Sequence, residues 1–318
     1  MPSRTTPRKP ARYTLPVPDF ELRRFAGPSI YTKQLDGIRV AHLTDQHVGR
    51  VTSHATQVGA VELTNAQEPD LVVLSGDFVA HSQEFLDQLV DVIRRFDAPV
   101  FGVLGNHDHW SGADEVRWAL RKAGAEVLDN AWTSIEVKHQ RLQVVGLDDA
   151  YTGNADIIRA TKGLDSRRPT IGISHIAEEA DALWDRGVPM VFSGHTHAGQ
   201  VTLARLHEFI LGRVVGHKYV HGLYGVRGGE RQGAVYVGAG IGAAVVPLRL
   251  GARGRREVAV FELGAEVGAF DEHHDEQEAQ PGRPPSPDVR HKRVLEAQRK
   301  SAKRRAAARR KGINPLAE

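Results

Sequence analysis

The sequence predicts an α/β fold in which two β-sheets pack face to face, with helices on their outer sides. In the first half, apolar runs of strand length alternate with amphipathic helical segments, which is typical of parallel strands joined by helical crossovers. In the second half, a hairpin pattern and further short apolar runs indicate a second sheet. Polar residues follow directly after several of these runs, and they carry the argument about function.

The elements of the first half are bounded by recognisable caps and breakers. Ser53 is placed to cap a helix, and Pro69 with Asp70 ends that helical pattern. Because parallel strands deliver their carboxyl ends to one edge of a sheet, the residues that follow them are expected to lie together. The predicted strands are 38–43, 71–74 and 99–104, and the predicted helices are 53–67, 82–96 and 112–123.

The second half is predicted to supply the other sheet. Two short strands joined by a polar turn form a hairpin, and one helical segment interrupts the later apolar runs. The predicted strands are 131–137, 141–147, 170–174, 188–192, 200–203, 234–238 and 257–263, and the predicted helix is 177–184.

The composition changes at both ends of the chain. Residues 1–35 are rich in proline and basic residues, and we expect an extended arm that lies on the domain or in solvent. Residues 36–264 form the predicted globular domain. From residue 265 the chain becomes acidic, then proline-rich, then basic, which predicts a disordered tail, with a helix around 294–310 as the alternative.

The composition also limits the chemistry and the location. The chain has no cysteine, which excludes disulfides, thiolate metal sites and cysteine nucleophiles, whereas its 16 histidines make imidazole an available metal donor. Imidazole, carboxylate and amide donors suit Mn, Fe, Zn or similar ions. We find no apolar run long enough for a membrane span, no secretory signal and no twin-arginine signal, and we expect a cytoplasmic protein.

Potential metal ligands recur immediately after the predicted strands. A two-metal hydrolytic site needs a carboxylate that bridges both ions, and Asp77 is the candidate. Asp45 and His47 are two positions apart and lie just beyond a predicted strand, and His195 and His197 repeat this arrangement. Asn106 would add a neutral oxygen. The metal-ligand candidates are Asp45, His47, Asp77, Asn106, His175, His195 and His197.

Any one of these histidines alone is better explained as an ordinary polar loop residue, and only the repetition at five strand ends favours a common site. His42 lies inside a predicted strand and is expected to be structural. Arg50 and Gln200 lie just beyond ligand-bearing loops, where they either contact a phosphate or are simply exposed. The remaining histidines lack this context and are not expected to be ligands: His54, His81, His139, His207, His217 and His221, with the tail pair His273 and His274 expected to be solvated.

The blocks Asp45-x-His47, Gly76-Asp77, Gly105-Asn106-His107-Asp108, His175 and Gly194-His195-x-His197 resemble, in order and spacing, the calcineurin-like metallophosphoesterase superfamily. The resemblance covers residues 38–263 and implies a four-layer α/β/β/α sandwich of two mixed sheets. It also implies two divalent metal ions and in-line attack on phosphorus by a hydroxide that bridges them.

The resemblance further implies a role for each block. The first ion would be held by Asp45, His47, Asp77 and His197, and the second by Asp77, Asn106, His175 and His195. His107 would contact the phosphate and protonate the leaving alkoxide, and Asp108 would support its loop.

A narrower likeness is to the bacterial phosphodiesterase branch that includes the UDP-2,3-diacylglucosamine pyrophosphatases. This chain departs from that branch at Ala198 and Ala239, where glycine and arginine are usual. We also expect no amino-terminal membrane anchor, a feature that is frequent in that branch. The segments that carry the likeness are 193–200, 218–219, 222–224, 240–242 and 247–249.

The sequence therefore predicts a dinuclear-metal-dependent phosphohydrolase, either a phosphodiesterase or a pyrophosphatase. One alternative is a non-catalytic scaffold of the same fold, which the complete set of ligand candidates disfavours. Another is a nucleic-acid processing enzyme, because the basic tail would attract phosphates. Contact of the tail with anionic lipid headgroups at the inner membrane face explains the same charge, and a solvated tail is the default.

Overall fold

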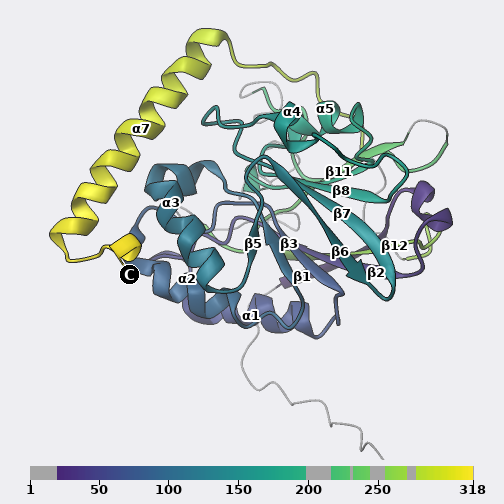
Figure 1. Cartoon of the computed structure of the whole chain (residues 1–318), viewed down its shortest axis with the longest axis horizontal. Coiled ribbons are helices and arrows are strands. Elements are labelled where there is room, and N and C mark those ends of the chain that lie inside the picture. The colour runs from purple at the N-terminus through teal and green to yellow at the C-terminus, as the bar shows by residue number, and fades with distance from the viewer. Residues whose placement is uncertain (1–19, 198–215, 230–231, 244–254, 271–276, 318) are drawn as a thin grey trace, which may run out of the picture.

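The computed structural model describes residues 20–197, 216–229, 232–243, 255–270 and 277–317, and these residues form two sheets of six strands each (Figure 1). The first sheet has the order β1-β12-β2-β3-β4-β5, and the second has the order β10-β11-β9-β8-β7-β6. Both sheets contain parallel and antiparallel pairs, as the sequence predicted.

The strands of the first sheet are β1 (Phe20–Ala26), β2 (Ile38–Leu43), β3 (Leu71–Leu74), β4 (Val100–Gly102), β5 (Glu126–Val127) and β12 (Arg256–Leu263). Those of the second are β6 (Ala131–Val137), β7 (Gln140–Leu147), β8 (Thr170–Ser174), β9 (Met190–Ser193), β10 (Gly222–Val226) and β11 (Gly233–Val237). The strands β2, β3 and β4 are mutually parallel, and so are β7, β8, β9 and β11, so each sheet gathers several carboxyl ends at one edge.

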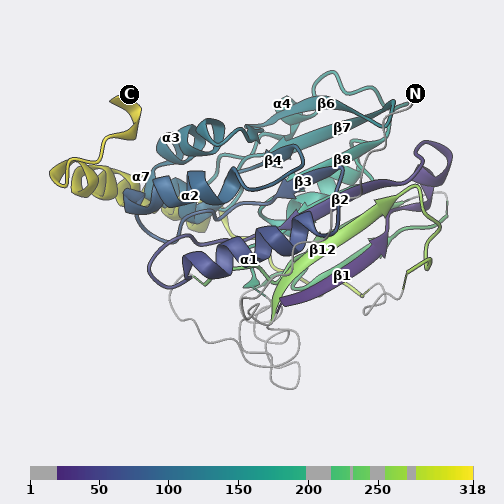
Figure 2. The same ribbon diagram turned by 90° about the horizontal axis from the view of Figure 1, so that it is seen from below.

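The helices lie on the outer faces of the two sheets, as the two views show (Figures 1 and 2). The helices α1 (His54–Asn65), α2 (Leu86–Ile93) and α3 (Asn106–Lys122) pack on the first sheet, and α4 (Ile157–Ala160) and α5 (Ala180–Trp184) pack on the second. The short helices η1 (Ser29–Lys33), η2 (Gln83–Phe85), η3 (Ala177–Glu179) and η7 (Pro315–Ala317) lie in the connections and at the carboxyl end. Ser53 caps α1 by accepting a hydrogen bond from the backbone N–H of Thr56, as predicted.

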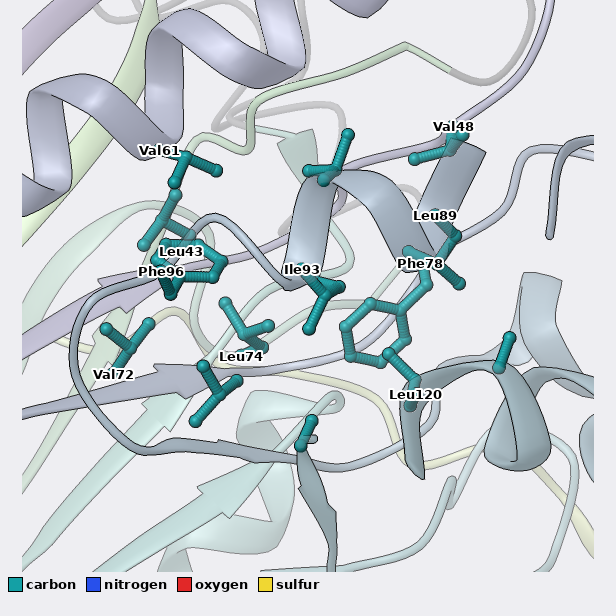
Figure 3. Packing of buried hydrophobic residues seen from close by; sticks show 14 of the residues in the cluster. Leu43, Val48, Val61, Val72, Leu74, Phe78, Leu89, Ile93, Phe96 and Leu120 are labelled. Carbon is teal, nitrogen blue, oxygen red and sulfur yellow. The ribbon is translucent and has the colours of Figure 1, made fainter. Parts of the chain in front are cut away.

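Three separate hydrophobic clusters define four layers. Figure 3 shows part of the first cluster, in which Leu74 of β3 and Ile93 of α2 pack between the first sheet and its helices. The second cluster lies between the sheets, and the third lies between the second sheet and α4 and α5. Successive residues of a strand point to opposite faces, so Val72 joins the helix-side cluster and Val73 joins the cluster between the sheets. The predicted α/β/β/α sandwich is confirmed.

Two strands lie where the sequence did not place them. Phe20–Ala26 pairs in parallel register with β12, so the predicted arm of residues 1–35 is wrong for this part, which belongs to the sheet. The strand β12 was expected in the second sheet, but it lies between β1 and β2 in the first. Both differences arise from pairing between the two ends of the domain, which no local pattern encodes. Strand β10 was not predicted, and the predicted strand 200–203 lies outside the described residues.

The predicted disordered tail contains a long helix, α7 (Pro287–Arg310), which lies beside α3 (Figure 1). Ser286 caps it by accepting a hydrogen bond from the N–H of Val289, and Pro287 occupies the first turn, where proline is tolerated. The alternative prediction of a helix around 294–310 was therefore correct, although α7 begins earlier. Within the described part of the chain, none of the helices combines the length and the apolar character needed to cross a membrane.

Candidate functional site

The strand ends from the two sheets meet and bring all the predicted metal ligands into one buried cluster. Loops after β2, β3 and β4 approach loops after β8 and β9, because the parallel strands of both sheets end at the same side of the sandwich. Asp45, His47 and His175 have no exposed surface. The side chains that meet here are those of Asp45, His47, Asp77, Asn106, His175, His195 and His197.

A first group of donor atoms has the composition predicted for one ion. Asp45, His47, Asp77 and His197 each offer a ligand atom, and these atoms all lie within 4.8 Å of one another. Nε2 of His197 lies 2.9 Å from Nε2 of His47 and 3.2 Å from a carboxylate oxygen of Asp45. Burial and the neighbouring His197 hold the pKa of His47 well below its ordinary value, so this imidazole is neutral. Neutral imidazole is the form that binds metals.

A second group forms around the amide of Asn106. Its Oδ1 lies 2.9 Å from Nδ1 of His195 and 3.2 Å from Nε2 of His175. The same nitrogen of His175 is 3.4 Å from Oδ2 of Asp77, and that oxygen is 3.7 Å from Nε2 of His47. The Asp77 carboxylate therefore lies between the two groups, which is the position expected of a bridging ligand.

The donor set fits two divalent cations. It consists of imidazole nitrogens and carboxylate and amide oxygens, which are donors that suit such cations. Oδ1 of Asp45 is buried and accepts no hydrogen bond within the described structure, so an acceptor is left to be satisfied. Burial would raise the pKa of Asp77, but His175 and His107 outweigh it and keep the carboxyl ionised.

Several ligand candidates have a strained backbone conformation with a positive φ angle. Positive φ angles occur at nine non-glycine residues of the described chain, and five of these are ligand candidates. Such conformations cost roughly 1–3 kcal/mol each and persist only where surrounding structure imposes them. Backbone hydrogen bonds between the loops impose them here, including those from Asp45 to Gly76 and from His47 to Asp77. The five residues and their φ angles are Asp45 (49°), His47 (45°), Asp77 (56°), His195 (76°) and His197 (52°).

Two glycines allow the loops to approach one another. A Cβ atom at Gly105 would collide with the Asp77 carboxylate, and one at Gly194 would collide with Asp45 and Thr44. Glycine at these positions is therefore a packing requirement of the site.

His107 and Asp108 occupy the first turn of α3 beside this cluster, because α3 begins at Asn106 and not at residue 112 as predicted. The backbone N–H of His107 donates to Oδ1 of Asp77 at 2.8 Å, and its Nδ1 lies 2.6 Å from the carbonyl oxygen of Ala80. Asp108 accepts hydrogen bonds from the N–H groups of Gly105 and Val79 and so joins the loops after β4 and β3. Burial, together with the Asp77 charge, raises the pKa of Asp108 to about 7.

Of the two predicted substrate-binding residues, the structure describes Arg50, which has no contact with the ligand candidates. The Arg50 side chain is 79% exposed and its guanidinium lies 3.6 Å from Glu84. Gln200 lies outside the described residues, as do Ala198 and the segment 247–249 of the narrower likeness. His42, expected to be structural, is buried and its Nε2 lies 2.9 Å from Oγ of Ser75.

Sequence reasoning missed an aromatic rim around the cluster. The Trp110 ring lies 4.7 Å from that of His107, the Tyr151 ring lies 5.4 Å from that of His195, and the two aromatic rings are 6.0 Å apart. His217 also lies beside His195, with ring centroids 5.4 Å apart. Tyr151 follows the parallel strand β7, so the rule that located the ligands would have located it too.

A family model described as "Calcineurin-like phosphoesterase" matches residues 38–199, which contain all the ligand candidates. This match covers half of the chain. The chain belongs to the calcineurin-like phosphoesterase family. Calcineurin-like phosphoesterases use divalent metals, and the chain is accordingly a phosphoric ester hydrolase with a possible metal-ligand cluster.

Relatives carry the same family description. The "Uncharacterized metallophosphoesterase YkuE" of Bacillus subtilis is 28% identical over 242 residues, which is 74% of this chain and 82% of that protein. "Phosphodiesterase YaeI" of Escherichia coli is 28% identical over 231 residues, which is 71% of this chain and 82% of that protein. A solved dimetal phosphatase from Danio rerio is 10% identical, with a TM-score of 0.44 over 72% of this chain and 100% of that chain.

Proposed function

We propose that this calcineurin-like phosphoesterase is a dinuclear-metal-dependent phosphohydrolase that acts as a phosphodiesterase or pyrophosphatase. The position of the Asp77 carboxylate, between the His47 and His175 nitrogens, carries the proposal. A carboxylate shared by two donor groups is what a two-metal centre requires. The similarity to the phosphodiesterase of Escherichia coli supports diester cleavage.

The ligand assignment proposed for the site follows the two donor groups. Asp45, His47, Asp77 and His197 would hold one divalent cation, and Asp77, Asn106, His175 and His195 would hold the other. When bound, such cations supply Lewis-acid stabilisation of phosphoryl oxygens and lower the pKa of water. Mn, Fe and Zn all suit these donors.

The protein itself contributes positioning and proton transfer. If Nδ1–H of His107 donates to the Ala80 carbonyl, Nε2 is the ring nitrogen left to face the substrate, and in the doubly protonated ring it would deliver its proton to the leaving oxygen and remain neutral. The N–H of His107 fixes one oxygen of Asp77, so the acid and the bridging carboxylate keep a constant relative position. Asp108 acts as a positioning residue, because its two backbone hydrogen bonds hold the loop that carries His107.

The experiment that tests this proposal compares hydrolysis and metal content in matched variants. The wild-type enzyme should hydrolyse bis-p-nitrophenyl phosphate with about two equivalents of Mn²⁺, Fe²⁺ or Zn²⁺, and Asp77→Ala should lose both turnover and metal. Asp97→Ala, at an exposed carboxylate, should change neither. Near-normal turnover of Asp77→Ala would refute the two-metal site, and a wild-type enzyme without diesterase or pyrophosphatase activity would refute the function.

The convergence of the ligand candidates also supports catalysis over a non-catalytic scaffold. A scaffold has no need to keep five strained ligand residues in three loops. The nucleic-acid alternative rested on a free basic tail, whereas α7 is packed along α3.

A further inference from the structure

Two adjoining hollows lie beside the metal-ligand cluster. One, of about 430 Å³, is bounded by residues 49–51 and 80–85. The other, of about 420 Å³, is bounded by residues 81–84 and by the side of α7 that carries Lys300, Lys303 and Arg304. His81, Ser82 and Glu84 line both hollows, and we call the two hollows together the α7 groove.

The α7 groove is continuous with the proposed catalytic acid. The His81 ring lies 5.0 Å from the His107 ring, and Ala80, which also lines the groove, accepts the hydrogen bond from Nδ1 of His107. On the α7 side, Nζ of Lys300 lies 3.7 Å from the centroid of the Trp110 ring, which itself contacts the His107 ring in a tilted arrangement. A substrate phosphorylated at more than one point would therefore reach the groove from the cluster.

The charge of the α7 groove is predominantly positive. Its lining contributes the cations of Arg50, Lys300, Lys303 and Arg304, and Glu84 is the sole carboxylate among the lining residues described. Glu84 is already paired with Arg50 and with Lys311, and Lys300 is paired with Glu296 at 2.7 Å, so Lys303 and Arg304 are the lining cations without a paired carboxylate among the described residues. The net charge of the lining therefore favours an anion.

Arg304 is the most informative of these cations. It is half-buried, yet its guanidinium has no hydrogen bond or ion pair to any residue in the described part of the chain. Burial lowers the pKa of Arg304, and no carboxylate counteracts this effect. A partly desolvated guanidinium without a partner is a natural ligand for phosphate, which it can bind through two parallel hydrogen bonds.

Helix α7 is held in place independently of this anion-binding side. Nε and Nη2 of Arg305 donate to the two carboxylate oxygens of the buried Glu115 at 2.8 and 3.0 Å, and Nη2 also reaches Asp114 at 2.9 Å. Further along, the Arg293 guanidinium lies 3.9 Å from the centroid of the Tyr151 ring. The lysine and arginine side chains of the groove are thus presented on a fixed support.

We propose that the α7 groove binds a phosphoryl group of the substrate other than the one attacked, and that the enzyme accordingly selects pyrophosphate diesters over simple phosphodiesters. The proposal rests on the proposed function, since it assigns a substrate class to the same site. Helix α7 would then contribute to substrate specificity, with Lys303 and Arg304 as the principal contacts of this second phosphoryl group.

The test compares one variant pair on two esters of the same nucleoside, one a pyrophosphate diester and the other a simple phosphodiester. The double variant Lys303→Gln/Arg304→Gln should raise the KM for UDP-glucose by about tenfold or more, because the loss of one charge-assisted hydrogen bond has an effect of this size. The KM for uridine 5′-(p-nitrophenyl phosphate) should stay within twofold of the wild-type value. The control, Arg309→Gln/Arg310→Gln, removes the same charge from exposed positions of α7 and should change neither KM. Thermal unfolding of both variants should show that α7 remains packed.

Binding without turnover provides the second measurement. Calorimetric titration of the chelator-treated full-length protein with inorganic tripolyphosphate should give a Kd that rises about tenfold in Lys303→Gln/Arg304→Gln and not in the control. An unchanged Kd, or an equal effect of both variants, would overturn the groove as a phosphate site. Loss of binding to phosphatidylglycerol vesicles, with tripolyphosphate binding unchanged, would assign these cations to a lipid surface and also overturn it.

These measurements separate the two proposals. A wild-type enzyme that hydrolyses neither substrate contradicts the proposed function, whereas the tripolyphosphate titration still decides whether the groove binds phosphate. Hydrolysis of both substrates with no differential effect of the variants contradicts only the inference about the α7 groove.

Discussion

Nε2 of His47 lies 2.9 Å from Nε2 of His197, although the two residues are 150 positions apart and follow strands of different sheets. Two imidazole nitrogens this close together are positioned to be ligands of one cation, as proposed for the first donor group. The site therefore exists only when both sheets are assembled, and its residues can be tested one by one.

Replacement of His197 by alanine should remove about one equivalent of metal and lower kcat for a phosphodiester by about a hundredfold or more, because one donor group is incomplete. Elemental analysis and steady-state kinetics on the same sample provide the measurement. His139→Ala is the matched control, since the His139 side chain is fully exposed on the hairpin between β6 and β7. Full metal content in the His197 variant would remove this residue from the ligand set.

Replacement of His107 by glutamine should lower kcat by about 10²–10⁴-fold and leave the metal content unchanged, because His107 is proposed to transfer a proton and not to bind the ions. Substrates with good leaving groups, such as p-nitrophenolate, should suffer less than those with alkoxide leaving groups. The comparison of these two substrate classes checks the assignment. An equal loss on both would show that His107 acts by positioning alone.

Replacement of Gly105 by alanine should disrupt the site sterically, because the added Cβ atom would collide with the carboxylate of Asp77. We expect loss of metal binding and destabilisation by about 1–3 kcal/mol, the usual cost of overpacking. Denaturant unfolding and metal analysis measure the two effects. Gly228→Ala is the control, because nothing lies within 4 Å of a Cβ atom at that position. If the Gly105 and Gly228 variants were equally stable, the steric argument would be contradicted.

The stability of the metal-free protein should fall as the pH drops below about 6.5, in part because of His42. Burial, opposed in part by Glu257, lowers the pKa of His42 to about 3. The folded state therefore keeps the ring neutral, while the unfolded state takes up a proton near pH 6.5. The stability due to this difference is complete above the unfolded pKa and is lost as the pH falls through the window from 6.5 toward 3.

His42→Gln should reduce the slope of unfolding free energy against pH within this window. One proton corresponds to a slope of about 1.4 kcal/mol per pH unit, so the variant should lose a measurable part of that dependence. Denaturant titrations at pH 4.5–7 on both proteins give the two slopes. Identical slopes would show that His42 is protonated in the folded state.

Helix α7 should detach when Arg305 is replaced by alanine, because the buried carboxylate of Glu115 then loses both of its hydrogen bonds. The expected cost is about 1–3 kcal/mol for an unsatisfied buried charge, and α7 should become sensitive to trypsin. Arg299→Ala, at an exposed position of the same helix, should leave the cleavage rate unchanged. Equal proteolysis of the two variants would contradict a docked α7.

This docking also changes what truncation should do. A tail that is disordered, as the composition suggested, would be dispensable for small substrates. Because Lys300 and Arg293 contact Trp110 and Tyr151 beside the cluster, removal of residues 287–318 should instead alter KM even for a small diester. Unchanged kinetics after truncation would show that the helix does not influence the site.

The sequence alone determined the local elements and the ligand set. Strands such as Leu71–Leu74 are apolar on both faces because they are covered on both sides, and Asp77 follows directly after one of them. Strand-end placement and residue chemistry therefore identified the ligand candidates that the fold brings together. These features are readable because they depend on neighbours within a few positions.

Only the tertiary structure decided which distant segments pair and pack. Phe20–Ala26 joins the sheet because β12 offers it an edge more than 200 residues later in the chain. Helix α7 is ordered by Glu115 and by the rings of Trp110 and Tyr151, which offset the ordering entropy that its own polar composition cannot. Such contacts depend on the assembled surface and leave no periodic trace in the sequence, which is why the sequence predicted neither the pairing of β1 with β12 nor the packing of α7 on α3.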